Sequence, residues 1–164
     1  MKIGLSSYSL DPLIKSGQMS LEQAIDWAAK NGAEVMELVP FAFRFDDPST
    51  GAIDKDMIAR VRRRAKDAGI ELVNYSVLAD LLKQGEEQEK EIARVCHEVD
   101  IAAELGLPRM RHDISAFRRP MDQNTQEAFD ALLPQMVEAA TRVSEYAKTR
   151  GVMTLLENHG FFVN

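Results

Sequence analysis

With 164 residues, the chain is the size of one ordinary domain, and its 45% hydrophobic and 28% charged residues are typical of a globular protein. Its net charge of -6 argues against a partner held mainly through phosphates, because nucleic-acid binding requires a basic footprint. No apolar run approaches the roughly 20 residues that cross a bilayer, and the single cysteine, Cys96, permits no internal disulfide. We therefore expect one cytoplasmic domain, residues 1–164, that binds neither nucleic acid nor membrane.

The first predicted strand covers residues 2–8, and the SLEQ sequence at residues 20–23 predicts a capping box that opens the first long helix. Four more strands are predicted, at residues 34–39, 71–76, 109–114 and 152–157. Each is a short apolar run that follows a glycine: Gly32, Gly69, Gly106 and Gly151. Glycine suits the position just after a helix, where the backbone turns with positive φ.

Helical periodicity fills the intervals between the predicted strands. In the last interval the apolar face runs from Phe129 to Val143, and we expect a kink or a restart at Pro134, because proline lacks the N–H that a helix interior needs. The basic run RVRRRAK at residues 60–66 also lies on a helical pattern, so Arg60, Arg63 and Arg64 point largely to solvent. We interpret this run as a solvated helix face rather than a nucleic-acid patch.

Strict alternation of strands and helices predicts an α/β fold with parallel strands and right-handed crossovers. A five-stranded doubly wound sheet would be complete at this length, whereas a (βα)8 TIM barrel, typically about 250 residues, would be present only as its first half. The segment after the first strand, LSSYSLDPLIKSGQMS, contains neither a GxGxxG turn nor a P-loop. This absence favours the TIM-barrel-like fold.

Polar residues gather where the predicted strands end, which is where parallel α/β folds carry function. The candidates are Glu37, His112, Asp113, Glu157 and His159. Carboxylates and imidazoles suit a divalent metal that polarises a carbonyl, and a carboxylate can take a proton from the neighbouring carbon. Structural alternatives remain: a helix cap for Glu157, a loop hydrogen bond for His159, a satisfied histidine at His112 and an ion pair at Glu37.

Three stretches carry a resemblance to a known family: KIGLSSYSL, MSLEQAIDWAAKNGAEVMEL and TLLENHG. They resemble the opening and the fifth strand of the sugar phosphate isomerase/epimerase family, the xylose-isomerase-like TIM barrels. This family includes hydroxypyruvate isomerases, ketose 3-epimerases and inosose dehydratases, with endonuclease IV as a DNA-repair relative. The resemblance covers all 164 residues, but only the first half of the family's barrel.

The resemblance implies a divalent-metal-dependent isomerase or epimerase of a small sugar, sugar phosphate or polyol. Glu157 matches the glutamate that ligates the metal (Mn, Mg, Co or Zn), and it is also the expected catalytic residue. His159 is expected to bind the substrate, and His112 and Glu37 match barrel-lining positions with the same expected role. The family's other metal ligands and its second catalytic glutamate come from strands six to eight, outside this sequence, so we expect weak metal binding by this chain alone.

Two other functions remain open. An endonuclease-IV-like phosphodiesterase would need more than the 3 histidines of this chain and a basic DNA face. A non-catalytic half-barrel that serves as a binding or assembly module would bind no metal. Half a barrel also leaves strand edges unpaired, so we expect a homo-oligomer or a longer polypeptide.

Overall fold

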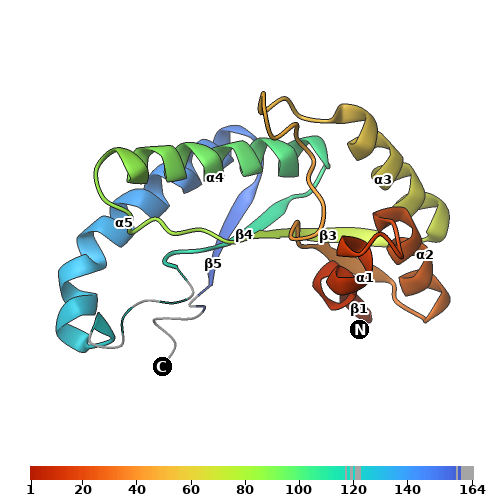
Figure 1. Cartoon of the computed structure of the whole chain (residues 1–164), viewed down its shortest axis with the longest axis horizontal. Coiled ribbons are helices and arrows are strands. Elements are labelled where there is room, and N and C mark those ends of the chain that lie inside the picture. Colours follow the sequence, from red (N-terminus) through yellow and green to blue (C-terminus); the bar gives the residue numbers. More distant parts are fainter. Residues whose placement is uncertain (117, 119, 121–122, 158, 160–164) are drawn as a thin grey trace. The chain divides into compact units, whose positions relative to one another are not determined.

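The computed structural model of the protein describes residues 1–116, 118, 120, 123–157 and 159 (Figure 1). It contains five strands that alternate with helices along the chain. The chain consists of two compact units. The first contains Met1–Ser76 and Ile101–Pro108, and the second contains Val77–Asp100 and Arg109–Asn164. In the described part of the chain, no helix combines the length and the apolar character that crossing a membrane requires.

The first unit contains three parallel strands: β1 (Gly4–Ser6), β2 (Val35–Leu38) and β3 (Glu71–Val77). β1 pairs with β2, and β2 pairs with β3, so the strands lie in chain order. A doubly wound sheet of the 2-1-3-4-5 type would place β1 between the other two. The observed order is that of a TIM barrel.

The first unit contains the two helices that the sequence predicts, α2 (Leu21–Lys30) and α3 (Lys55–Ala68), and two short ones that it does not, η1 (Ser7–Leu10) and α1 (Asp11–Lys15). Ser20 and Gln23 form the capping box of α2, and α3 ends at Gly69 with φ of 72°. Ile25 of α2, Met36 of β2 and Val61 of α3 are fully buried in the core.

The second unit contains β4 (Arg109–Asp113), α5 (Gln126–Thr149) and β5 (Met153–Glu157), and most of α4 (Glu86–Glu104). α5 continues through Pro134 as one helix, so of the expected kink or restart the restart is wrong, and the kink stays a prediction. Val143 and Ala147 of α5 are fully buried and anchor it to the core. The buried residues of α5 all follow the proline (Met136, Ala139, Val143 and Ala147), and their packing outweighs the one backbone hydrogen bond that proline removes.

β4 and β5 are parallel, with Arg109 opposite Met153 and Asp113 opposite Glu157. Five parallel strands alternate with helices, as in half of a TIM barrel, and this confirms the predicted α/β fold. The register of β4 and β5 places the carboxyl ends of both strands side by side, and these ends carry the candidate site.

Candidate metal centre

Successive side chains of β4 point to opposite faces of the strand. Arg109, Arg111 and Asp113 share one face, whereas Met110 and His112 share the other, where both are fully buried. Asp113 ends the strand with only 1% of its surface exposed. The sequence RMRHD thus presents a charged face and a buried face in strict alternation.

Asp113, Glu157 and His159 come together after β4 and β5. Each offers one possible ligand atom, and these three atoms lie within 4.8 Å of one another. His159 Nδ1 is 3.6 Å from Asp113 Oδ1. Two carboxylates and an imidazole are a donor set suited to Mn²⁺, Mg²⁺ or Zn²⁺, so the residues present fit a divalent metal.

Arg111 links the two carboxylates of this group. Its Nη1 atom lies 3.0 Å from Asp113 Oδ1 and 2.7 Å from Glu157 Oε2. Asp113 opposes Glu157 in the strand register, and Arg111 precedes Asp113 on the same face of β4, so pairing and alternation together produce the contact. The guanidinium compensates two negative charges that would otherwise repel each other.

The buried position of Asp113 changes its acidity. Burial raises the pKa of Asp113 above its ordinary value, and the nearby negative charge of Glu157 acts in the same direction. The positive charges of Arg111 and His159 lower the pKa of Asp113 and oppose only part of this rise. A further positive charge beside Asp113 would therefore stabilise its ionised form.

The structure does not bring His112 into the group of Asp113, Glu157 and His159. The ring of His112 is fully buried on the other face of β4, and its Nδ1 lies 2.9 Å from the backbone oxygen of Asp113. Burial lowers the pKa of His112, and the positive charges of Arg111 and Arg94 lower it further. A neutral ring that donates from Nδ1 explains this contact, and the role of His112 in substrate binding stays a prediction.

Glu37 lies on β2, in the first unit. Its Oε1 accepts a hydrogen bond from Asn74 Nδ2 at 2.9 Å and another from Ser76 Oγ, both on β3. These two donors hold the carboxylate within the sheet. The predicted role of Glu37 in substrate binding stays a prediction.

The predictions from the sequence did not include Arg111, and they included Asp113 only as one of several strand-end residues of a type that suits a divalent metal. Glu157 was expected to be the only metal ligand in this chain, and the structure places two further candidates, Asp113 and His159, beside it. The sequence RMRHD did contain a signal for Arg111, because this arginine alternates with Met110 and His112, the residues of the buried face. The contact itself depends on the register between β4 and β5, which no local pattern specifies.

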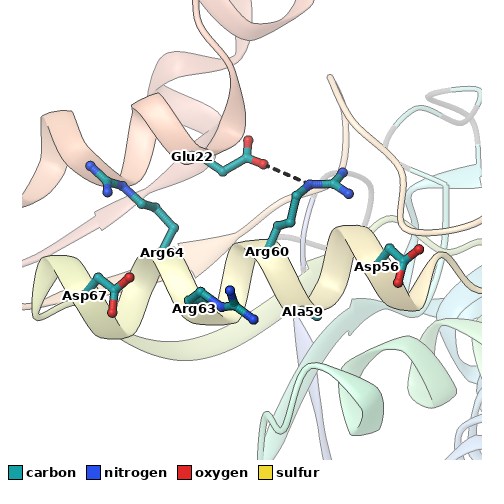
Figure 2. A pocket seen from close by; sticks show the side chains of 7 residues that line it. All are labelled: Glu22, Asp56, Ala59, Arg60, Arg63, Arg64 and Asp67. Carbon is teal, nitrogen blue, oxygen red and sulfur yellow. Dashed lines mark ion pairs between the residues drawn. The ribbon is translucent and has the colours of Figure 1, made fainter.

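The basic run of α3 lines an open hollow in the first unit. Figure 2 shows Arg60 reaching from α3 toward Glu22 of α2, at 3.6 Å, with Arg63 and Arg64 on the same helix. Arg64 pairs with Asp26, also on α2. All three arginines are exposed, as the helical pattern predicts.

Comparisons with known proteins agree with this fold. The family model described as xylose isomerase-like TIM barrel matches residues 25–164. A D-psicose 3-epimerase with D-tagatose from Clostridium cellulolyticum H10 is similar in structure, with a TM-score of 0.69 and 18% identity over 100% of this chain and 54% of that chain. No curated protein matched the sequence.

Two further solved structures are also similar in fold to this chain. The probable 3-DHS dehydratase AsbF from Bacillus anthracis, involved in petrobactin synthesis, has a TM-score of 0.68 and 18% identity over 98% of this chain and 53% of that chain. A sugar phosphate isomerase/epimerase from Parabacteroides distasonis ATCC 8503 has a TM-score of 0.62 and 21% identity over 94% of this chain and 50% of that chain.

The chain spans about half the length of these solved structures. At such identities the structural likeness shows the fold alone. The family model, however, matches most of the sequence, and the order of parallel strands agrees with it. This chain belongs to the xylose isomerase-like TIM barrel family.

Proposed function

We propose that the protein is a divalent-metal-dependent isomerase or epimerase that acts on a small sugar, sugar phosphate or polyol by proton transfer next to a carbonyl. The observation that carries this proposal is the group of Asp113, Glu157 and His159, whose possible ligand atoms lie within 4.8 Å of one another. Similar solved structures support the reaction class, since they include a D-psicose 3-epimerase and a sugar phosphate isomerase/epimerase.

The two carboxylates differ in solvent exposure, and this difference suits them to different roles. Asp113 is buried and can hold a metal but cannot reach a substrate, whereas 44% of the Glu157 side chain is exposed. When bound, a divalent metal polarises the carbonyl oxygen of the substrate. Glu157 both ligates that metal and helps to move the proton, and His159, with 41% of its side chain exposed, contacts the substrate from beside it.

Proton transfer of this kind conserves all atoms and electrons. A carboxylate takes the proton from the carbon next to the carbonyl, and an enediolate remains. If the same carboxylate returns the proton to the neighbouring carbon, the product is an isomer; if a second acid delivers a proton to the opposite face of the first carbon, the product is an epimer. This chain would supply the first carboxylate, and the resemblance implies that the second acid lies outside this sequence.

Deuterium exchange tests the proposal. The full-length polypeptide is incubated in D2O with Mn²⁺ or Mg²⁺ and a panel of ketoses and ketose phosphates. We expect one substrate class to gain deuterium next to its carbonyl as product forms, and a chelator to stop the exchange. Glu157→Gln should abolish it, whereas Glu145→Gln, an exposed carboxylate of α5, should not.

A duplex with an abasic site belongs in the same assay. Cleavage of this duplex without turnover of any sugar contradicts the isomerase proposal and favours a phosphodiesterase. Exchange that persists in Glu157→Gln contradicts the assigned role of Glu157.

We also propose a cytoplasmic location, because a lone cysteine, Cys96, suits a reducing compartment. Cell fractionation with an antibody against the native protein tests it. Recovery of the protein outside the cytoplasmic fraction contradicts this location.

A further inference from the structure

Arg111 is a cation placed within the candidate centre. Both of its ion pairs within the described part of the chain go to Asp113 and Glu157, which are candidate metal ligands. Only 20% of its side chain is exposed. The guanidinium is therefore held inside the centre rather than extended into solvent.

The two contacts come from the same nitrogen atom. Nη1 lies 3.0 Å from Asp113 Oδ1 and 2.7 Å from Glu157 Oε2, so it bridges the two carboxylates. A divalent metal that both oxygens ligate would stand about 2.0–2.6 Å from each of them, in the space that Nη1 now fills. One position between the same two oxygens cannot hold both cations.

Charge leads to the same conclusion as geometry. Asp113 and Glu157 together carry two negative charges in a partly buried place, and Arg111 compensates one of them. A bound divalent metal would compensate both carboxylates and would repel a guanidinium in contact with it. Metal binding and the two ion pairs of Arg111 are thus in competition.

We propose that Arg111 acts as an internal counter-cation that occupies the space between Asp113 and Glu157 and must leave it when a divalent metal binds. This inference rests on the metal centre of the proposed function and adds a residue that sets its affinity. Arg111 keeps the two carboxylates together without metal, and the same contacts weaken metal binding. The guanidinium is a positioning group for the two carboxylates rather than a ligand.

Manganese binding to the whole 164-residue chain tests this competition. The free Mn²⁺ signal in electron paramagnetic resonance is titrated for the wild type, Arg111→Gln and Arg109→Gln. Arg109 is the matched control, because it lies on the same face of β4 and is exposed. A charge-assisted contact contributes about 1.5–3 kcal/mol, so we expect Arg111→Gln to bind Mn²⁺ roughly tenfold or more tightly than the wild type.

Arg109→Gln should bind Mn²⁺ within about twofold of the wild type, because charge alone at an exposed position has a small effect. If Arg111→Gln binds Mn²⁺ as weakly as the wild type or more weakly, the inference about Arg111 is wrong, while the proposed metal centre still holds. Absence of Mn²⁺ binding in all three proteins removes the metal centre itself, and the inference with it.

A measurement on the wild type does not depend on the folding of any variant. Nuclear magnetic resonance of ¹⁵N-labelled arginine side chains is followed while Mg²⁺ is added. We expect the Arg111 Nε signal to shift with saturation and the Arg109 signal to stay unchanged. An unchanged Arg111 signal at concentrations that saturate the centre overturns the inference.

Discussion

Glu91 of α4 is a buried carboxylate with several donors around it. Only 8% of its side chain is exposed, and it pairs with Lys83 at 3.0 Å and with Arg94 at 2.7 Å. The backbone N–H of Asp80 donates to it at 3.1 Å, and Arg94 also donates to the backbone oxygen of Leu78. Glu91 therefore fastens the segment after β3 to α4.

These contacts determine the acidity of Glu91. Burial raises the pKa of Glu91, but the donors from Arg94, Asp80 and Lys83 outweigh burial and lower this pKa from 4.5 to about 2. A lowered pKa in the folded state means that ionised Glu91 stabilises the fold above about pH 4.5, and this stabilisation is lost as the pH falls toward about 2.

We predict that Glu91→Gln lowers the free energy of unfolding by on the order of 2–3 kcal/mol at neutral pH. The difference from the wild type should shrink to about half at roughly pH 3, because Glu91 is then largely protonated in the unfolded state while it is still ionised in the folded state. Urea unfolding at both pH values measures it. Glu87→Gln, an exposed carboxylate of the same helix, serves as the control and should change stability by less than about 0.5 kcal/mol. A Glu91→Gln deficit that stays constant or grows toward acid contradicts the account.

The candidate site could be predicted only in part from single residues. Glu157 and His159 stand out because they follow an apolar strand and include groups that bind metals. Asp113 and Arg111 gain their roles from the pairing of β4 with β5, which brings Asp113 opposite Glu157. A shift of one residue in that register would turn these side chains to the other face, and the sequence of β4 alone does not fix the register.

At the scale of elements, the predicted strands agree with the structure except at their ends. The predicted strand at residues 2–8 ends earlier, at Ser6, because Ser7–Leu10 forms a 3-10 helix that the Ser6 side chain caps. The glycines behave as expected: Gly106 and Gly151 both have φ of 72°. Hydrophobic period and glycine position were sufficient here, because both act over a few neighbouring residues.

Pro134 does not divide α5 into two helices, so the expected restart is absent there. Pro134 is exposed, so its ring packs little against the core, while the buried residues that follow it hold α5 in place. The proline still removes one backbone hydrogen bond from the helix interior. Its presence should therefore reduce the stability of the second unit.

We predict that Pro134→Ala raises the free energy of unfolding by about 1–3 kcal/mol, because alanine restores the missing N–H and has the highest helix propensity. Urea unfolding monitored by circular dichroism measures the change. Ser144→Ala, at another exposed position of α5, is the control and should change stability by less than about 0.5 kcal/mol. A destabilised Pro134→Ala protein would show that the proline fits a local bend that α5 requires.

At the scale of the whole molecule, β5 exposes apolar side chains. Met153 is 62% exposed and Leu156 is 56% exposed, and Val137 of α5 is 57% exposed. Within the described part of the chain, β5 pairs only with β4, so its other edge presents free backbone groups. An apolar edge strand of this kind favours pairing with another chain.

We predict that the 164-residue chain associates with a second copy of itself through β5. Sedimentation velocity should show a sedimentation coefficient that rises with protein concentration. Leu156→Ser should weaken this association, whereas Leu78→Ser, an exposed leucine after β3, should leave it unchanged. A wild-type chain that stays monomeric at every concentration contradicts this prediction.

A Mn²⁺ titration followed by electron paramagnetic resonance tests the metal centre of Asp113, Glu157 and His159. Wild type, Glu157→Gln and the control Glu145→Gln are compared at neutral pH. We predict saturable binding of one Mn²⁺ per wild-type chain, a loss of affinity of more than about tenfold in Glu157→Gln, and no change in Glu145→Gln. Wild-type protein without saturable binding, or Glu157→Gln protein that binds Mn²⁺ as tightly as the wild type, would contradict it.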